Sequence, residues 1–208
     1  MKNILLFLFV GSLLMSCGSK KGISSNGFSK AQTTLIMNAD YLTPMRVFKI
    51  TSKSDSILLR TKSEAVKVLP NDPVLKNFVN RLYATVRDSM SLGLGIAAPQ
   101  VGILKNIIWV QRLDKNDMPF EVYLNPKIVE YSKEKQTARE GCLSIPNRRA
   151  VLENRAEKIV VTYDTMEGTQ RTETVEGFTS VIFQHEVDHL NGILYLDHLN
   201  KEIKDAKK

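Results

Sequence analysis

The sequence predicts an α+β fold, and three observations lead to this class. An amphipathic helix is expected over 72–86, short runs of β-forming residues lie between 106 and 175, and a helix over 178–190 carries two histidines. This order of helix, strands and final helix is an α+β pattern. The 208 residues leave room for one domain with a sizeable core.

The composition narrows the classes of function. Apolar residues make up 43% of the chain and charged residues 25%, which is typical of a globular protein. The net charge of +7 is spread in runs of mixed sign, and no basic run alternates with aromatics, so we expect no nucleic-acid partner. The two cysteines, Cys17 and Cys142, lie in very different contexts, so no disulfide is predicted.

The beginning of the chain, residues 1–17 (MKNILLFLFVGSLLMSC), has the pattern of a signal peptide. Lys2 supplies a positive start, and 4–14 is an apolar run shorter than the about 20 residues of a transmembrane helix. The end of this stretch resembles a bacterial lipobox, which implies that Cys17 is lipidated and anchors the protein to a membrane. The alternative is a buried N-terminal helix of the domain.

Residues 18–44 predict a flexible tether. Residues 18–30 are rich in Gly, Ser and Lys and show no packing pattern, and 31–44 are ambiguous and are grouped with them. The folded domain is then expected over 45–208, with the run MRVFKI from Met45 as a first strand.

The first half of the domain predicts one helix followed by strands. Asp72 and Pro73 suit the cap and the first position of a helix, and apolar residues recur at helical spacing as far as Val86. Residues 106–110 and 120–124 are apolar runs that predict strands. After the break at Asn125-Pro126, residues 127–131 are expected to continue the sheet.

The second half of the domain predicts a hairpin and a helix. Residues 158–164 and 170–175 are β-type runs joined by a turn through Glu167-Gly168. Residues 178–190 predict a helix with an apolar face, and 197–208 predict a short terminal helix.

The helix over 178–190 contains the motif HExxH. His185 and His189 are four residues apart, so one helical face brings both rings to one metal ion. Glu186 is not spaced as a ligand, but it projects beside the ion, where it can hold a water molecule and move its proton. A surface helix that carries the motif by chance is the alternative.

The third ligand decides which kind of enzyme this is. Metalloproteases with this motif take it from a His six residues further or from a Glu about twenty residues further. In this chain the residue six positions past His189 is Tyr195, and His198 lies nine positions past it, which does not fit. The chain ends nineteen residues past His189. Upstream, Cys142 lies in the run EGCLS, and a thiolate is a strong ligand for iron or zinc. The commoner fate of a lone cysteine is a small buried residue.

A glycine-containing run, GLGIAAPQ over 93–100, is the third informative stretch. It lacks the preceding strand and spacing of a dinucleotide-binding loop. It is either a tight connection between helix and sheet, or a backbone edge open to a peptide with Gln100 as an amide donor.

Three motifs together, GLGIAAPQ, EGCLS and QHEVDHLNG, resemble those of the peptide deformylases. They occur in the same order, and the resemblance runs from about Met45 to Leu199. It implies a peptide-deformylase-like fold, with antiparallel or mixed sheets around a central HExxH helix. It also implies a metal-dependent amide hydrolase that removes the formyl group from N-formylmethionyl peptides and releases formate, by attack of a metal-bound water.

The resemblance assigns roles to individual residues. Cys142, His185 and His189 match the metal ligands, and Glu186 matches the general acid and base. Gln100 and the backbone N–H of Leu143 match the pair that stabilises the oxyanion. The positions that match substrate-binding residues are Gly95, Leu94, Glu140, Arg149, Phe178, Val181 and Ile182. Fe²⁺ is the implied metal, with Zn²⁺, Ni²⁺ or Co²⁺ as alternatives.

The leader and the catalytic motifs point to different compartments. A lipidated Cys17 would place the domain on the periplasmic face of a bacterial membrane, whereas formylated nascent chains are cytoplasmic. We expect the lipid-anchored form. The alternative is a cytoplasmic protein whose translation starts at Met37 or Met45. Two other functions stay open: an HExxH metallopeptidase, and a lipid-anchored peptide-binding module with weak catalysis.

Overall fold

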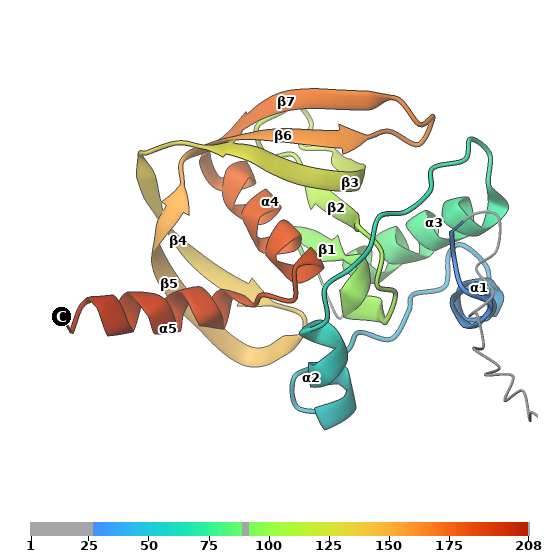
Figure 1. The fold of residues 1–208 in the computed structure, drawn as a ribbon, viewed down its shortest axis with the longest axis horizontal. Coiled ribbons are helices and arrows are strands. Elements are labelled where there is room, and N and C mark those ends of the chain that lie inside the picture. Colours follow the sequence, from blue (N-terminus) through green and yellow to red (C-terminus); the bar gives the residue numbers. More distant parts are fainter. Residues whose placement is uncertain (1–26, 89–91, 208) are drawn as a thin grey trace, which may run out of the picture.

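The computed structural model describes residues 27–88 and 92–207 and contains five α-helices and seven strands in this part of the chain (Figure 1). The helices are α1 (Lys30–Met37), α2 (Lys53–Leu59), α3 (Pro73–Arg87), α4 (Gly177–Leu190) and α5 (Tyr195–Asp205), with a short 3-10 helix η1 (Ala98–Val101). The strands are β1 (Gly95–Ala97), β2 (Ile107–Gln111), β3 (Phe120–Tyr131), β4 (Lys135–Cys142), β5 (Ile145–Ala156), β6 (Lys158–Asp164) and β7 (Gln170–Glu176).

The strands form two antiparallel sheets. One has five strands in the order β1-β2-β3-β6-β7, and the other is the hairpin of β4 and β5. The predicted α+β class with antiparallel sheets is confirmed. The predicted helix over 72–86 is confirmed as α3, with Asp72 accepting hydrogen bonds from the N–H groups of Val74 and Leu75. The hairpin of 158–164 and 170–175 is confirmed as β6 and β7.

Helix α4 lies between the two sheets (Figure 1). Phe183 and Val187 on this helix are buried with Ile108 and Tyr123 of the five-stranded sheet in one hydrophobic cluster. Ten of its fourteen residues are buried, and five of these ten are polar or charged. The helix that carries HExxH is therefore held on several sides, which fixes the direction of its side chains.

The hairpin of β4 and β5 is absent from the sequence prediction. Its strand β4 buries Ala138 and Glu140 on one face, so a charged residue occupies a position where the alternation rule expects an apolar one. Helix α2 was also not predicted. Glu140 can be buried in β4 because it forms an ion pair with Arg155 of β5, and only the folded chain brings these two residues together.

The predicted tether over 18–44 is wrong for its second half. Phe28 and Ile36 are fully buried against α3, and α1 begins at a capping box in which Ser29 and Gln32 exchange hydrogen bonds. The buried guanidinium of Arg81 donates to the carbonyls of Leu35, Ile36 and Thr43 and to Asn38 Oδ1. The folded unit thus already includes Phe28 and does not start at Met45. The predicted signal peptide, its Cys17 and residues 18–26 lie outside the described residues.

The strand predicted from Met45 is also wrong. The segment joins neither sheet, and its N–H groups donate one by one to residues of helices and turns. Phe48 N–H donates to Gln100 O at 2.7 Å, and Ile50 N–H donates to Ser144 O at 3.0 Å. The segment therefore connects η1 with the turn between β4 and β5.

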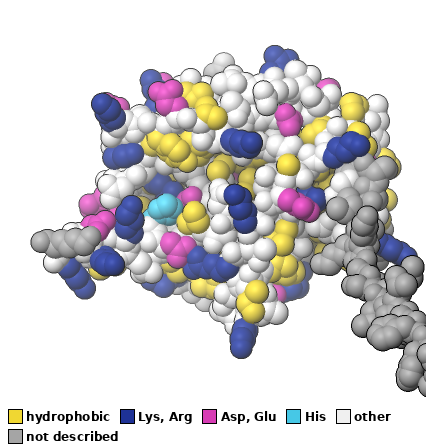
Figure 2. Space-filling view, viewed as in Figure 1, with side chains coloured by type: hydrophobic (Ala, Val, Ile, Leu, Met, Phe, Trp, Pro, Cys, Tyr) yellow, Lys and Arg dark blue, Asp and Glu magenta, His cyan; other side chains and the backbone are white. Residues whose placement is uncertain are grey.

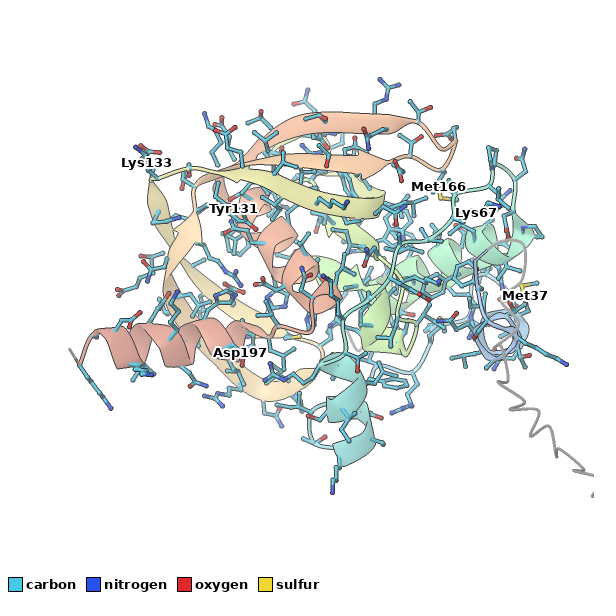
Figure 3. The ribbon with its side chains drawn as sticks, in the orientation of Figure 1. Met37, Lys67, Tyr131, Lys133, Met166 and Asp197 are labelled. Carbon is cyan, nitrogen blue, oxygen red and sulfur yellow. The ribbon has the colours of Figure 1, made fainter. Side chains whose placement is uncertain are left out.

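The terminal helix α5 begins two residues before the predicted start at 197, ends at Asp205 and packs on β5. Leu152 of β5 and Leu196 of α5 share a small hydrophobic cluster. Asp197, at the start of α5 (Figure 3), forms a salt bridge with Arg60, which follows α2. Over the ranges 27–88 and 92–207, no helix combines the length and the apolar character needed to span a bilayer. On the face in Figure 2, Lys and Arg side chains lie among acidic and hydrophobic ones.

Candidate metal centre and its cleft

The fold brings one cysteine and two histidines together. Helix α4 presents His185 and His189 one turn apart, and β4 ends at Cys142 beside them. A possible ligand atom of each residue lies within 4.8 Å of the other two, and Cys142 Sγ is 3.1 Å from His189 Nε2. A thiolate with two imidazoles is a donor set that binds iron or zinc and leaves a coordination position open.

The ring of His185 is oriented by a carboxylate. Its Nδ1 is 2.7 Å from Oε2 of Glu140, so Nε2 is the nitrogen left for a metal. Glu140 is itself held by Arg155, whose Nε and Nη2 donate to its two oxygens at 2.7 and 3.0 Å. Such a carboxylate fixes the tautomer and direction of a ligand histidine. Burial raises the pKa of Glu140, but hydrogen bonds from His185 and Arg155 outweigh it and hold the pKa below its ordinary value.

The thiol of Cys142 is poised to ionise. Burial raises its pKa, but the neighbouring His189 and His185 favour the thiolate more strongly, and the pKa falls well below the usual value for cysteine. A lowered thiol pKa is the condition for metal binding, because the thiolate and not the thiol is the ligand. Cys142 is therefore more than a small buried apolar residue.

The carboxyl group of Glu186 is buried beside the centre. Its Oε2 has no hydrogen-bond partner among the described residues. Burial raises the pKa of Glu186 to about 7, and the nearby His185 and His189 oppose this only in part. A carboxyl with a pKa near neutrality and a free oxygen is suited to exchange a proton with a substrate or a water molecule.

Gln100 in η1 and Leu143 in the turn between β4 and β5 both lie next to Cys142. The side chain of Gln100 is fixed because its Oε1 accepts from Ala97 N–H at 2.8 Å, while Nε2 is 3.6 Å from Cys142 Sγ and 3.3 Å from Ser144 Oγ. Leu143 occupies the turn between β4 and β5, directly after Cys142, where its N–H lies outside the strand ladder. Two donors thus flank the cysteine. Ser144, which helps to place the amide, was not predicted.

A cleft of about 1040 Å³ opens over this group. The predicted site residues that line it are Leu94, Gly95, Gln100, Glu140, Cys142, Leu143, Arg149, Phe178, Val181, Ile182, His185 and Glu186. His189 does not line the cleft and is buried behind it. Gly95 lies so close to Glu186 that an added Cβ would be 2.6 Å from Oε1. Leu94 and Phe178 are partly exposed apolar side chains at its mouth.

Two further side chains support the centre from behind and were not predicted. The guanidinium of Arg155 contacts Asp188 as well as Glu140, and its Nη1 donates to Asp188 Oδ2 at 2.8 Å. His198 contacts the same oxygen at 2.8 Å, so this downstream histidine pairs with Asp188. In the described part of the chain, the group that could hold a metal is Cys142, His185 and His189. It contains no residue after His189, whereas a metallopeptidase of this motif would take its third ligand from there. An isolated arginine gives no sequence signal for such a role.

Comparisons with known proteins agree with this geometry. The family model described as polypeptide deformylase matches residues 47–205. A peptide deformylase from Desulforudis audaxviator is 41% identical over 155 residues, which cover 74% of this chain and 94% of the relative.

Solved structures match in the same region. The K3U-bound class I type b peptide deformylase of Acinetobacter baumannii superposes with a TM-score of 0.67 at 35% identity, covering 75% of this chain and 99% of that chain. The form of that enzyme bound to Met-Ala-Ser gives a TM-score of 0.65 at 34% identity, covering 75% of this chain and 98% of that chain. With the metal-capable group, the buried carboxyl and the cleft in place, the chain belongs to the polypeptide deformylase family and is a hydrolase that acts on N-formyl peptides.

Proposed function

We propose that this cleft removes the formyl group from N-formylmethionyl peptides by hydrolysis. Water adds to the formyl carbon, the C–N bond breaks, and formate and a free methionyl amine result. The observation that supports it most is a cleft lined by Cys142, His185 and Glu186, with His189 buried beside Cys142. The relative bound to Met-Ala-Ser has a deformylated peptide in its structure, which agrees with this substrate class.

Cys142, His185 and His189 would hold the metal. The lowered thiol pKa and the orientation of His185 by Glu140 fit a divalent transition metal. We propose Fe²⁺ first, with Zn²⁺, Ni²⁺ or Co²⁺ as alternatives, because sulfur and imidazole suit all four. When bound, such a metal lowers the pKa of water and polarises the formyl oxygen.

Glu186 carries the proton in this proposal. Its carboxylate takes a proton from the attacking water and later gives it to the amine that leaves, so one group is base and then acid. The raised pKa of about 7 suits both directions near neutral pH. Gln100 Nε2 and Leu143 N–H donate to the oxygen on which negative charge develops, and preplaced donors of this kind are commonly worth a hundredfold or more in rate. Val181 and Ile182, on α4 beside the site, line the part of the cleft that would take the methionine.

We further propose that the protein is a lipoprotein facing the periplasm, anchored through Cys17. The lipobox-like sequence motivates this, and the fold supports a translation start upstream of Phe28. Starting at Met37 or Met45 would delete Phe28 and Ile36, which are fully buried. Mass spectrometry of the native N-terminus tests the proposal. A diacylglyceryl-Cys17 peptide supports it, and a native chain that begins at Met37 or Met45 contradicts it.

The activity itself is tested on protein purified without oxygen. The metal content is measured first, and formate release is then followed with formyl-Met-Ala-Ser beside cleavage of unformylated peptides. Formate release with no peptide-bond cleavage supports the proposal, whereas peptide-bond cleavage alone would favour the metallopeptidase. The Glu186→Gln variant should keep its metal and lose roughly a hundredfold or more in kcat, because proton transfer by a placed carboxyl is worth about that much. Near-normal turnover in this variant would refute the role of Glu186.

A further inference from the structure

We propose that the outer cleft selects formyl peptides that carry a carboxylate beyond the methionine. The inference rests on the proposed function and names the substrate class more closely. Among the residues that line the cleft are five with cationic side chains, which are Arg46, Lys49, Arg139, Arg148 and Arg149. The acidic residues that line it are Asp88, Glu140 and Glu186.

Two of the three acidic side chains that line the cleft are buried. Glu140 is buried in its ion pair with Arg155 and its contact with His185. Glu186 is also buried, with its Oε1 close to Gly95 at the metal centre. Among the described residues that line the cleft, Asp88 is therefore the one acidic side chain that is not buried.

The cationic side chains are mostly not neutralised. Arg46 forms a salt bridge with Asp55 at 2.7 Å. Lys49, Arg139, Arg148 and Arg149 are exposed, and no salt bridge joins any of the four to another described residue. The outer cleft thus presents more positive charge than its own acidic groups balance.

The hairpin of β4 and β5 places the arginines together. Gly141 pairs with Arg149 in the strand register, and Arg139, two residues before Gly141, lies on the same face. The side chain of Arg149 runs over Gly141, where an added Cβ would meet its Cγ at 3.2 Å. Arg148 directly precedes Arg149 on β5 and also lines the cleft, and its carbonyl accepts from Tyr195 Oη at 3.0 Å. The positive charge is therefore built on paired strands directly beside Cys142.

A peptide in this cleft would pass these side chains. Its formyl group lies at the centre, and an extended chain advances about 3.3 Å per residue, so the next residues run outward towards the rim. A carboxylate there can accept paired hydrogen bonds from an arginine. A cleft lined by one sign of charge also raises the local concentration of an oppositely charged substrate, and salt weakens this effect.

The test uses four formyl peptides that differ only beyond the second residue. Formyl-Met-Ala-Ser amide is the neutral reference, formyl-Met-Ala-Ser acid adds a terminal carboxylate, formyl-Met-Ala-Glu amide adds a side-chain carboxylate, and formyl-Met-Ala-Lys amide adds a positive charge. We expect kcat/KM of at least one carboxylate peptide to exceed the reference by about fivefold at low salt, with the lysine peptide lowest. The gain should lie in KM, since the carboxylate is remote from the reacting atoms. It should shrink in high salt.

The variant is the double substitution Arg139→Gln and Arg148→Gln in the full chain. It should clearly lower the ratio of carboxylate to neutral peptide, because it removes two of the four cleft cations that form no salt bridge with a described residue. The matched control is Arg171→Gln on β7, an exposed arginine that does not line the cleft, which should leave the ratio unchanged. The two carboxylate peptides show whether chain ends or acidic side chains are selected.

Three outcomes would overturn the inference, and a fourth would overturn the proposed function on which it rests. A wild-type ratio near one overturns the selection, and so does a ratio that survives the double substitution. An equal loss in the Arg171→Gln control also overturns it, because net charge and not the cleft would then be responsible. No formate from the neutral reference would instead overturn the proposed function.

Discussion

Glu140 Oε2 lies 2.7 Å from Nδ1 of His185, so a carboxylate on β4 sets the direction of a candidate ligand on α4. The same carboxylate is held by Arg155. We expect Glu140→Gln to weaken metal binding by about tenfold or more, because the partners of a ligand histidine are typically worth that much. Competition with a chelator measures it, and circular dichroism checks that the variant is folded. Unchanged metal affinity in a folded variant would show that Glu140 has a purely structural role.

Cys142 should be required for the metal. The Cys142→Ala variant removes the sulfur beside His189 Nε2 and leaves two imidazoles, so we expect it to be purified largely without metal. Elemental analysis measures the metal per chain. Glu186→Gln is the matched control, because it lies at the same centre but should keep its metal. Stoichiometric iron or zinc in Cys142→Ala would contradict the ligand role.

The metal-free protein should lose stability as Glu186 ionises. Its pKa in the folded state is about 7, above the ordinary 4.5, so the folded state holds the proton more tightly than the unfolded chain. The favourable contribution is complete below about 4.5 and is lost as the pH rises to about 7, a change of up to about 3 kcal/mol.

The check compares denaturant unfolding of metal-free wild type and Glu186→Gln at pH 4.5 and pH 8. The variant keeps a neutral group, so it should gain stability over the wild type between these values. A difference between the two proteins that does not change with pH would disprove the shifted titration.

Gly95 should tolerate no side chain. In Gly95→Ala the new Cβ would lie 2.6 Å from Glu186 Oε1 and 2.9 Å from Ile182 Cγ2, so the carboxyl must move. We expect kcat to fall about tenfold or more while the metal content stays normal, because small displacements of a catalytic group are costly. Steady-state kinetics with elemental analysis measure both. Full kcat in the variant would show that Glu186 need not keep its position.

Residues 28–44 should stabilise the folded domain. A chain that starts at Met45 lacks Phe28 and Ile36 and leaves the buried Arg81 without the carbonyls that it contacts. Each of the two apolar side chains contributes about 1.5–3 kcal/mol, so we expect the Tm to fall by roughly 10 °C or more. A chain that starts at Gly27 is the control and should melt like the full protein. Equal Tm values for all three would mean that α1 does not stabilise the fold.

Much of this protein follows from local sequence patterns. The helix at 73–87 and the hairpin of β6 and β7 come from apolar periodicity, a cap and a turn, which act within a few residues. The HExxH motif fixes the relative positions of His185 and His189, because neighbouring turns of one helix place them together. The third ligand could only be inferred from the run EGCLS and the resemblance that it carries.

The tertiary structure decided what depends on contacts between distant segments. Cys142 reaches His189 only because β4 ends against α4, and Glu140 is buried in a strand because the guanidinium of Arg155 on β5 forms an ion pair with it. No local pattern encodes such a pair, since a buried charge interrupts the alternation by which a strand is recognised. Phe28 shows the same limit: an aromatic residue in a stretch rich in Gly, Ser and Lys is buried only because α3 supplies the surface.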